Sequence, residues 1–243
     1  MAIHLIDYDE TQIVVVIDKK FDLKLADFIK RVKKMELHNL KNKPCFIIGA
    51  GEHAKTIIES LLLNGADIAG CTDTNKNIGE KVLGNIKVLG NDDIIEAQNS
   101  NDIYVFNGLG SVKTTEMRAQ VYQAFKEKGF HFPVLKHPQA VISSFANIGM
   151  GSVIQAAAII QAGANLHENI LINTGAQIDH DCIIDSHSHI APGSILSGNV
   201  KVGENTHIGT QATVIQNIEI GSHVTVGAGV VVKKNVEAGA IIT

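Results

Sequence analysis

The sequence predicts an α/β plus all-β protein, in which a small Rossmann-like parallel-sheet domain precedes a parallel β-helix of hexapeptide repeats. Two observations lead to this prediction. From Ile148 to Val232, every sixth residue is Ile, Leu or Val for fifteen consecutive hexads. Between Pro44 and Leu135, strand-like apolar runs alternate with amphipathic helical runs, as they do in α/β sheets.

The repeat contains a second lane of small or aliphatic residues, two positions before each residue of the first lane, from Ala146 to Val230. The other four positions of each hexad are rich in Gly, Asn, Ser, His and Gln, which favour turns. No helix has a period of six, so each hexad is expected to form one short strand and one corner. Three hexads close a triangular coil, which predicts five coils, each stacked on the next.

Composition and charge limit the classes of function. The 243 residues allow one large or two modest domains. The net charge of −4 provides no basic surface for nucleic acid or an anionic membrane, and no apolar run is long enough to span a bilayer. The three cysteines, Cys45, Cys71 and Cys182, are scattered without metal-type or redox spacing. We therefore expect a cytoplasmic protein.

The chain divides into three segments. Residues 1–43 form an N-terminal extension, predicted as a strand at Gln12–Ile17 followed by an amphipathic helix around Leu25–Val32. Residues 44–137 form the Rossmann-like domain, and residues 138–243 form the β-helix. Because no Ser/Gly-rich linker follows His137-Pro138, we expect the last two domains to pack together and to form a cleft.

The elements of the Rossmann-like domain follow one another at short spacing. The predicted order is strand 45–48, helix from about residue 54 to 63, strand 66–71, strand 103–106, helix 114–128 and strand 130–135, with weak signals between residues 74 and 102.

The first turn of this domain reads Gly49-Ala50-Gly51-Glu52-His53-Ala54 and matches G-x-G-x-x-A. Glycines let a phosphate approach the backbone, and the N-terminus of the following helix favours negative charge. Asp73 ends the second strand, where an acidic group meets ribose hydroxyls. Because the domain is only half of a doubly wound sheet, a mononucleotide or nucleotide sugar is favoured over NAD or a purely structural turn.

Within the repeat, His180 occupies a corner outside both lanes and is flanked by Asp179 and Asp181. A carboxylate bonded to one imidazole nitrogen fixes the tautomer and raises the basicity of the other nitrogen, as a general base near neutral pH requires. The alternative is a corner histidine that only bonds the turn backbone. That role is favoured for each of four other histidines that lie at or near corners, namely His187, His189, His207 and His223.

The order of these motifs resembles one family. G-A-G-x-H, then His-Pro, then hexads containing D-H-D-C-I-I and S-G-N-V-K-V-G are similar to the bacterial sugar acetyltransferases of the hexapeptide-repeat superfamily, over about residues 44–240. These include UDP-4-amino-sugar N-acetyltransferases and sialic-acid O-acetyltransferases. The resemblance implies a left-handed β-helix, a homotrimer with sites between subunits, acetyl-CoA as co-substrate, a nucleotide-sugar substrate, no metal, and a role in lipopolysaccharide or other glycan biosynthesis.

By position, the resemblance implies direct acetyl transfer with His180 as catalytic base and Asp181 as the acid that raises its basicity. It implies acetyl-CoA contacts at His189, Thr210 and Ala228, with a backbone N–H near Gly198 for the tetrahedral oxyanion. The nucleotide-sugar contacts it implies are Gly51, Glu52, His53, Asp73 and Gly110.

Two stretches depart from the family pattern, because residues 1–43 have no counterpart and the sequence ends at Gly239–Thr243, before the family's Pro-Ala-Lys tail. Three other functions stay open. One is O-acetylation of a sialic-acid-like sugar, which the same base serves. Another is a prism-type carbonic anhydrase with zinc held by three histidines, for which His180, His187 and His189 have no obvious spacing. The third is a non-catalytic scaffold that senses a nucleotide.

Overall fold

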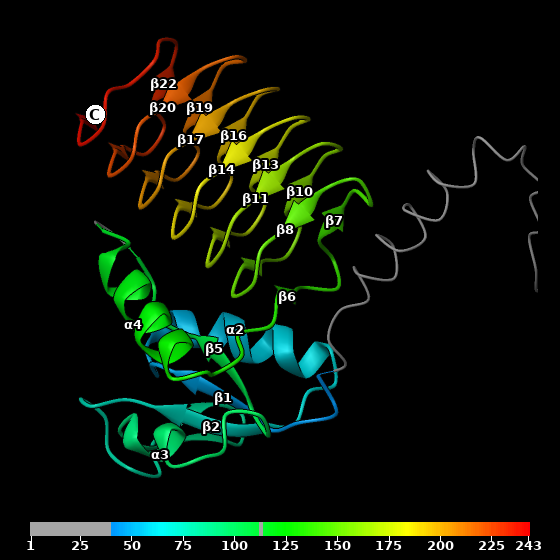
Figure 1. Cartoon of the computed structure of the whole chain (residues 1–243), viewed down its shortest axis with the longest axis vertical. Helices are drawn as coiled ribbons and strands as arrows, with labels where there is room; N and C mark the ends of the chain where they lie inside the picture. The colour runs from blue at the N-terminus through cyan, green and yellow to red at the C-terminus, as the bar shows by residue number, and fades with distance from the viewer. Residues whose placement is uncertain (1–39, 112–113) are drawn as a thin grey trace, which may run out of the picture. The chain divides into compact units, whose positions relative to one another are not determined.

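A computed structural model describes residues 40–111 and 114–243 (Figure 1). The strand and helix expected between Gln12 and Val32 lie outside these residues. The sheet domain and the β-helix belong to one compact unit. Within the part of the chain that is described, no helix combines the length and apolar character needed to cross a membrane.

The α/β domain is built on a five-stranded sheet of order β3-β4-β2-β1-β5. Its strands are β1 (Cys45–Ile48), β2 (Ile68–Thr72), β3 (Lys81–Leu83), β4 (Ile86–Gly90) and β5 (Tyr104–Asn107). The four strands β4, β2, β1 and β5 are parallel, which confirms the predicted sheet. Strand β3 pairs antiparallel with β4 at the edge. This hairpin was not predicted, because the segment between residues 74 and 102 has weak strand signals.

Helices cover both faces of this sheet. The helices are α2 (Glu52–Leu63), α3 (Asp93–Glu96) and α4 (Glu116–Glu127). Cys45 and Ile47 of β1 pack with α2, whereas Phe46 and Ile48 pack with α3 and α4 on the opposite face. This alternation follows from the two-residue period of a strand.

The strand predicted at residues 130–135 is wrong for most of its length. Of these residues only Leu135 lies in a strand, and with Lys136 it forms β6, which pairs with β9 (Val153–Ile154) of the β-helix and does not join the α/β sheet. Phe130 and Phe132 pack into the apolar core beside α4. Pro133 has no N–H for a sheet ladder, which explains why the apolar run does not continue as a strand.

The β-helix has three faces, each of which is a parallel sheet of two-residue strands stacked coil on coil (Figure 1). The first face contains β7 (Val141–Ile142), β10 (Ile159–Ile160), β13 (Gln177–Ile178), β16 (Ile195–Leu196), β19 (Thr213–Val214) and β22 (Val231–Val232). The second face contains β8 (Asn147–Ile148), β11 (Asn165–Leu166), β14 (Ile183–Ile184), β17 (Lys201–Val202) and β20 (Glu219–Ile220). The third face contains β6, β9, β12 (Leu171–Ile172), β15 (His189–Ile190), β18 (His207–Ile208), β21 (Thr225–Val226) and β23 (Ile241–Ile242).

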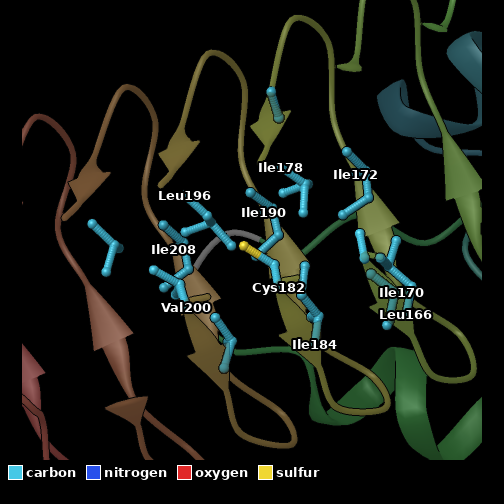
Figure 2. Close-up of a cluster of buried hydrophobic side chains, with 14 of the residues drawn as sticks. Leu166, Ile170, Ile172, Ile178, Cys182, Ile184, Ile190, Leu196, Val200 and Ile208 are labelled. Carbon is cyan, nitrogen blue, oxygen red and sulfur yellow. The ribbon is translucent and has the colours of Figure 1, made fainter. Parts of the chain in front are cut away.

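The two lanes read from the sequence form the core of this coil (Figure 2). All members of the first lane except Ile148, which is partly buried, and all members of the second lane except Val230 are buried. Hydroxyls in the second lane bond the backbone of the following coil. Ser188 Oγ donates to Gly203 O at 2.8 Å and Ser194 Oγ donates to Gly209 O at 2.9 Å. The predicted hexapeptide period is therefore confirmed.

The repeat extends beyond the fifteen hexads at both ends. At its start, β6 and β7 add strands in phase with the first lane. At its end the phase changes, because Val226 pairs with Ile242, sixteen residues later, whereas Ile208 pairs with Val226 at the usual eighteen.

From Gly151 to Gly229, every sixth residue lies in the left-handed backbone region, at the same corner position of its hexad. The non-glycine members are Ala157, Asn169, Asp181, His187, Asn199, Asn205, Gln211, Asn217 and His223, with φ between 53° and 66°. Asn, Asp and His tolerate this region better than most residues. The polar corners noticed in the sequence therefore have a backbone cause, and Asp181 is one of them.

Candidate active site

One pocket of about 820 Å³ lies between the α/β domain and the third face of the β-helix. Eight of the residues singled out in the sequence line it. Five come from the α/β domain and three from the β-helix: Gly51, Glu52, His53, Asp73, Gly110, His189, Thr210 and Ala228. The expected cleft between the two domains is therefore present, and it contains both sets of predicted ligand contacts.

The N-terminus of α2 opens into this pocket. Gly51 is the N-cap and has no side chain, and Gly49 adopts φ +88°, where other residues are strained. Asp73 shapes the turn, because its two carboxylate oxygens accept the N–H of Ala50 at 2.9 Å and that of Asn75 at 2.8 Å. The first backbone N–H groups of α2 thus form an anion-binding end of the pocket.

Glu52 lies in the first turn of α2 and faces solvent. Its carboxylate pairs with Lys55 at 2.6 Å, and this hydrogen bond lowers the pKa of Glu52. The helix as a whole is fixed against the β-helix, since Gln155 Nε2 donates to Thr56 Oγ1 at 3.0 Å. These contacts hold the turn at a fixed distance from the third face.

His189 projects from β15 into the wall of the pocket and is only 5% exposed. Its Nδ1 lies 2.7 Å from Ser111 Oγ, and its Nε2 lies 3.1 Å from Asn173 Nδ2. Burial lowers the pKa of His189 to about 3, with a further contribution from nearby His207. His189 is therefore neutral at physiological pH and does not act as a proton carrier there.

His53, on the opposite wall, is in a similar state. Burial lowers its pKa to about 4, and the positive charge of Arg118 lowers it further. Its Nε2 is buried without a hydrogen-bond partner among the described residues. An unpartnered buried nitrogen in a pocket wall is available to a ligand.

The loop after β5, residues 107–111, forms the wall between these two histidines. Arg118 of α4 is fully buried and holds this loop, since Nη1 donates to Leu109 O at 2.6 Å and to Asn107 O at 3.3 Å. Its Nη2 lies 3.4 Å from Asn169 Oδ1 of the β-helix. Burial lowers the pKa of Arg118 to about 10, so the guanidinium remains charged at neutral pH.

His180 and Asp181 form a second, exposed group. His180 Nδ1 lies 2.9 Å from Asp181 Oδ2, and the two side chains are 62% and 66% exposed. Asp179 Oδ1 accepts the backbone N–H of His180 at 2.7 Å. The pKa of His180 is raised, first by the hydrogen bond to Asp181 and then by the charge of Asp179.

Gly198 lies in the next coil directly beside the imidazole of His180. A Cβ at Gly198 would be 2.6 Å from both Cε1 and Nε2 of His180, closer than carbon atoms approach without displacement. Only glycine therefore leaves room for the observed position of the ring. This is a steric role that the sequence did not predict.

The structure does not bring the two groups of predicted residues together within one chain. His180 and Asp181 lie at the corner between β13 and β14, where the first face meets the second. The pocket lies on the third face and at the corner that leads from it to the first face, which contains Thr210 and Ala228. The first face separates them.

Sequence reasoning assigned no part in the pocket to four residues that line or support it. His207 has a signal, since it lies eighteen residues after His189 and pairs with it in the sheet. Asn173 has a weak signal, because the same corner position is Gln155 in the preceding coil but Ala191, Gly209 and Gly227 in the later coils. Ser111 and Arg118 have no signal, because their contacts with the β-helix depend on how the domains pack.

The cysteines do not contribute a nucleophile. All three are free and buried. Cys182 lies in the inner lane, its thiol donates to Ser197 O at 3.2 Å, and burial raises its pKa to about 11. Among residues 40–111 and 114–243, no three His, Cys, Asp or Glu side chains are arranged to hold a metal ion.

A mononucleotide-type sheet domain packed on a hexapeptide β-helix, with a surface histidine–aspartate pair, defines a class of acyltransferase. Comparison with known proteins agrees. Residues 45–125 match the PglD N-terminal domain family, and residues 199–234 match the bacterial transferase hexapeptide (six repeats) family. No curated protein sequence matches the chain.

Solved structures provide the more extensive matches. The acetyltransferase domain of PglB from Neisseria gonorrhoeae, in complex with acetyl-CoA, is 35% identical with a TM-score of 0.76, covering 82% of this chain and 95% of that one. PerB from Caulobacter crescentus, in complex with CoA and GDP-perosamine, is 32% identical with a TM-score of 0.75, covering 82% of this chain and 92% of that one. A mutant of perosamine N-acetyltransferase from the same organism is 30% identical, with the same TM-score and coverage.

The chain therefore belongs to the bacterial sugar acetyltransferases of the hexapeptide-repeat superfamily. It is an acetyltransferase, and acetyl-CoA is its co-substrate.

Proposed function

We propose that this enzyme transfers the acetyl group of acetyl-CoA to the amino group of a nucleotide-linked amino sugar, with His180 as general base. The observation that carries the proposal is the exposed His180–Asp181 pair, in which a carboxylate bonds one imidazole nitrogen and leaves the other free. The relatives bound to CoA and GDP-perosamine support the substrate class. Both substrates are cytoplasmic metabolites, which supports a cytoplasmic enzyme of glycan biosynthesis.

The mechanism follows from the tautomer. Because Asp181 accepts the Nδ1–H of His180, Nε2 carries the lone pair that takes a proton from the amine as its nitrogen attacks the thioester carbonyl. The tetrahedral oxyanion is stabilised by a backbone N–H near Gly198. When the intermediate collapses, the carbon–sulfur bond breaks and protonated His180 returns the proton to the CoA sulfur. The base itself contributes about 10²–10⁴-fold to the rate.

The separation of the two groups within one chain supports a homotrimer. In a ring of three chains, the His180 corner of one subunit faces the pocket of its neighbour, and the first face is the surface between them. That face carries exposed apolar side chains at Val141 (62%), Ile195 (37%) and Val231 (51%). Light scattering coupled to gel filtration measures the mass. A monomer that is fully active contradicts this arrangement.

The two substrates divide the pocket. The nucleotide sugar binds at the N-terminus of α2, with contacts from Gly51, Glu52, His53, Asp73 and Gly110, which line that side. Acetyl-CoA lies along His189, Thr210 and Ala228. Thr210 and Ala228 are eighteen residues apart, so they follow one corner from coil to coil.

A substrate screen tests the reaction. The purified protein is incubated with acetyl-CoA and UDP-, dTDP- or GDP-linked 4-amino sugars, and the released thiol is measured. We expect turnover with at least one of them and an N-acetylated product by mass spectrometry. Turnover only with free or CMP-linked sialic-type sugars identifies an O-acetyltransferase and overturns the amine acceptor.

The base is tested with His180→Asn, which we expect to lower kcat/KM by about 10²–10⁴-fold without changing the oligomer. The matched control is His167→Asn. His167 Nδ1 lies 3.1 Å from Asp185 Oδ1, so the two residues form another exposed histidine–aspartate pair, at a different corner. An equal loss in both variants shows that His180 has no special role.

A further inference from the structure

Ser111 is the least expected member of the pocket wall. It lies at the end of the loop after β5, it is 7% exposed, and its Oγ is 2.7 Å from Nδ1 of His189. A serine hydroxyl beside a histidine is often a nucleophile and its base. The hydrogen bonds around His189 exclude that interpretation and assign Ser111 a different role.

The tautomer of His189 follows from Asn173. Asn173 Oδ1 accepts the backbone N–H of Thr174 at 2.8 Å, so the group that faces His189 is the amide nitrogen. An amide nitrogen only donates, and Nε2 of His189 therefore accepts. Because the imidazole is neutral, its single proton is on Nδ1, which points at Ser111.

The direction of the Ser111 bond is then fixed. Nδ1–H of His189 donates to Ser111, with Oγ at 2.7 Å and the carbonyl O at 3.1 Å as acceptors. Nδ1 has no lone pair to take the hydroxyl proton, so His189 is not a base for Ser111. The hydroxyl hydrogen of Ser111 has no acceptor among the described residues, although the group is more than nine-tenths buried. A buried donor without an acceptor in a pocket wall needs one from a ligand.

The surroundings select an anionic acceptor. Arg118 is buried behind the same loop, and it has no carboxylate within ion-pairing distance among the described residues. Its charge lowers the pKa of both His53 and His189, so its positive potential extends across the pocket. Gly110, next to Ser111, lies against His53 in the first turn of α2, since a Cβ at Gly110 would be 3.4 Å from that of His53. The donor is thus beside the anion-binding end of α2.

We propose that Ser111 is a substrate-binding residue whose hydroxyl, oriented by the Asn173–His189 hydrogen bonds, donates to a diphosphate oxygen of the nucleotide sugar. This inference deepens the proposed function and rests on it for the identity of the ligand. CoA also carries a diphosphate. The proximity of Ser111 to the N-terminus of α2 assigns the bond to the nucleotide sugar.

Calorimetric binding to the intact protein tests this inference separately from catalysis. UDP, GDP, dTDP and CoA are titrated into the parent protein, Ser111→Ala and Ser60→Ala. Ser60 is the matched control, because its buried hydroxyl lies on α2 and contacts Gln155 outside the pocket. We expect Ser111→Ala to weaken binding of the preferred nucleoside diphosphate by tenfold or more and to leave CoA affinity unchanged.

The structural consequences of Ser111→Ala are small, since His189 keeps the carbonyl of Ser111 as an acceptor. Unchanged nucleotide affinity, or a loss confined to CoA, overturns the assignment. A different result would contradict the proposed function and not this inference. That result is a parent protein that binds the nucleotide normally but acetylates no nucleotide sugar. The tautomer of His189 can be measured separately by NMR on protein labelled with nitrogen-15 histidine. The signals of His189 are assigned by their loss in His189→Gln, and we expect their shifts to show a proton on Nδ1. A proton on Nε2 overturns the inference even if the variant fails to fold.

Discussion

Two histidines nine residues apart show how one repeat provides two opposite environments. His180 lies at a corner, is 62% exposed, and has its pKa raised by a carboxylate. His189 lies on a strand of the third face, is 5% exposed, and has its pKa lowered to about 3 by burial. The two environments differ because the histidines occupy different positions in the hexad and because different parts of the protein surround them. The corner that contains His180 faces solvent, whereas the α/β domain covers the part of the third face that contains His189.

The comparison separates proton transfer from ligand positioning. A base that works near neutral pH needs an accessible nitrogen. The ring of His180 is exposed, and the hydrogen bond to Asp181 raises its pKa. A neutral imidazole with both nitrogens engaged orients its neighbours, as His189 orients Ser111. In the proposed mechanism, the β-helix therefore provides the base at one edge and the binding surface at another.

After the loss of the His180 ring itself, the largest effect is expected from crowding that ring. Gly198 does not adopt a positive φ, so the backbone accepts Gly198→Ala, but the new Cβ displaces the His180 ring. A displacement of about 1 Å can cost about 10²-fold in rate. We expect a loss of that order in kcat, with the thermal midpoint unchanged.

The double variant shows whether this loss acts through the ring. Adding Gly198→Ala to His180→Asn should produce no further loss, because no base is left to displace. A further tenfold drop in kcat in the double variant indicates that Gly198 acts on the substrate or the oxyanion directly, and that the steric explanation is wrong.

A smaller effect is expected from Asp181→Asn, which keeps a residue that tolerates φ of 59° but removes the charge. The base is active when neutral, so kcat/KM falls as pH drops through the pKa of His180, which Asp181 raises. Without that carboxylate the pKa falls, so the acidic limb of the pH–rate profile moves to lower pH. A weaker and less firmly oriented base lowers the plateau by about tenfold.

The matched control for this change is Asp185→Asn, since Asp185 pairs with His167 at a different corner. We expect its profile to coincide with that of the parent protein. An acidic limb that stays in place in Asp181→Asn means that another group is the titrating base.

The parts of the molecule that depend on local pattern could be predicted, whereas the parts that depend on packing could not. The two lanes of the repeat, the strand before Gly49 and the helix after Gly51 are set by periodicity and turn chemistry within a few residues. The His180–Asp181 bond joins chain neighbours, so the sequence already suggested it. These features are all local.

The roles of Ser111, Arg118 and Gly198 depend on contacts between distant segments. Arg118 lies on a helix that was predicted, but nothing in its neighbourhood indicates that its guanidinium holds residues 107–109 and reaches Asn169. Gly198 resembles the other corner glycines until the ring of the preceding coil is placed beside it. The separation of the pocket from the His180–Asp181 pair likewise depends on how the coils fold, because the two groups lie at different corners of the β-helix.

The smallest expected effect is on stability, and it tests the burial of His189. His189 is neutral when folded down to about pH 3, whereas the unfolded chain takes up a proton near pH 6.5. The contribution of neutral His189 to the free energy of unfolding is therefore fully present above pH 6.5 and is lost as pH falls. The loss is about 1.5 kcal/mol between pH 6.5 and pH 5. His189→Gln keeps a donor and an acceptor but does not titrate, so its unfolding free energy should fall less steeply over this range. Urea unfolding at fixed protein concentration measures the slope, and equal slopes in parent and variant mean that His189 is not buried in solution.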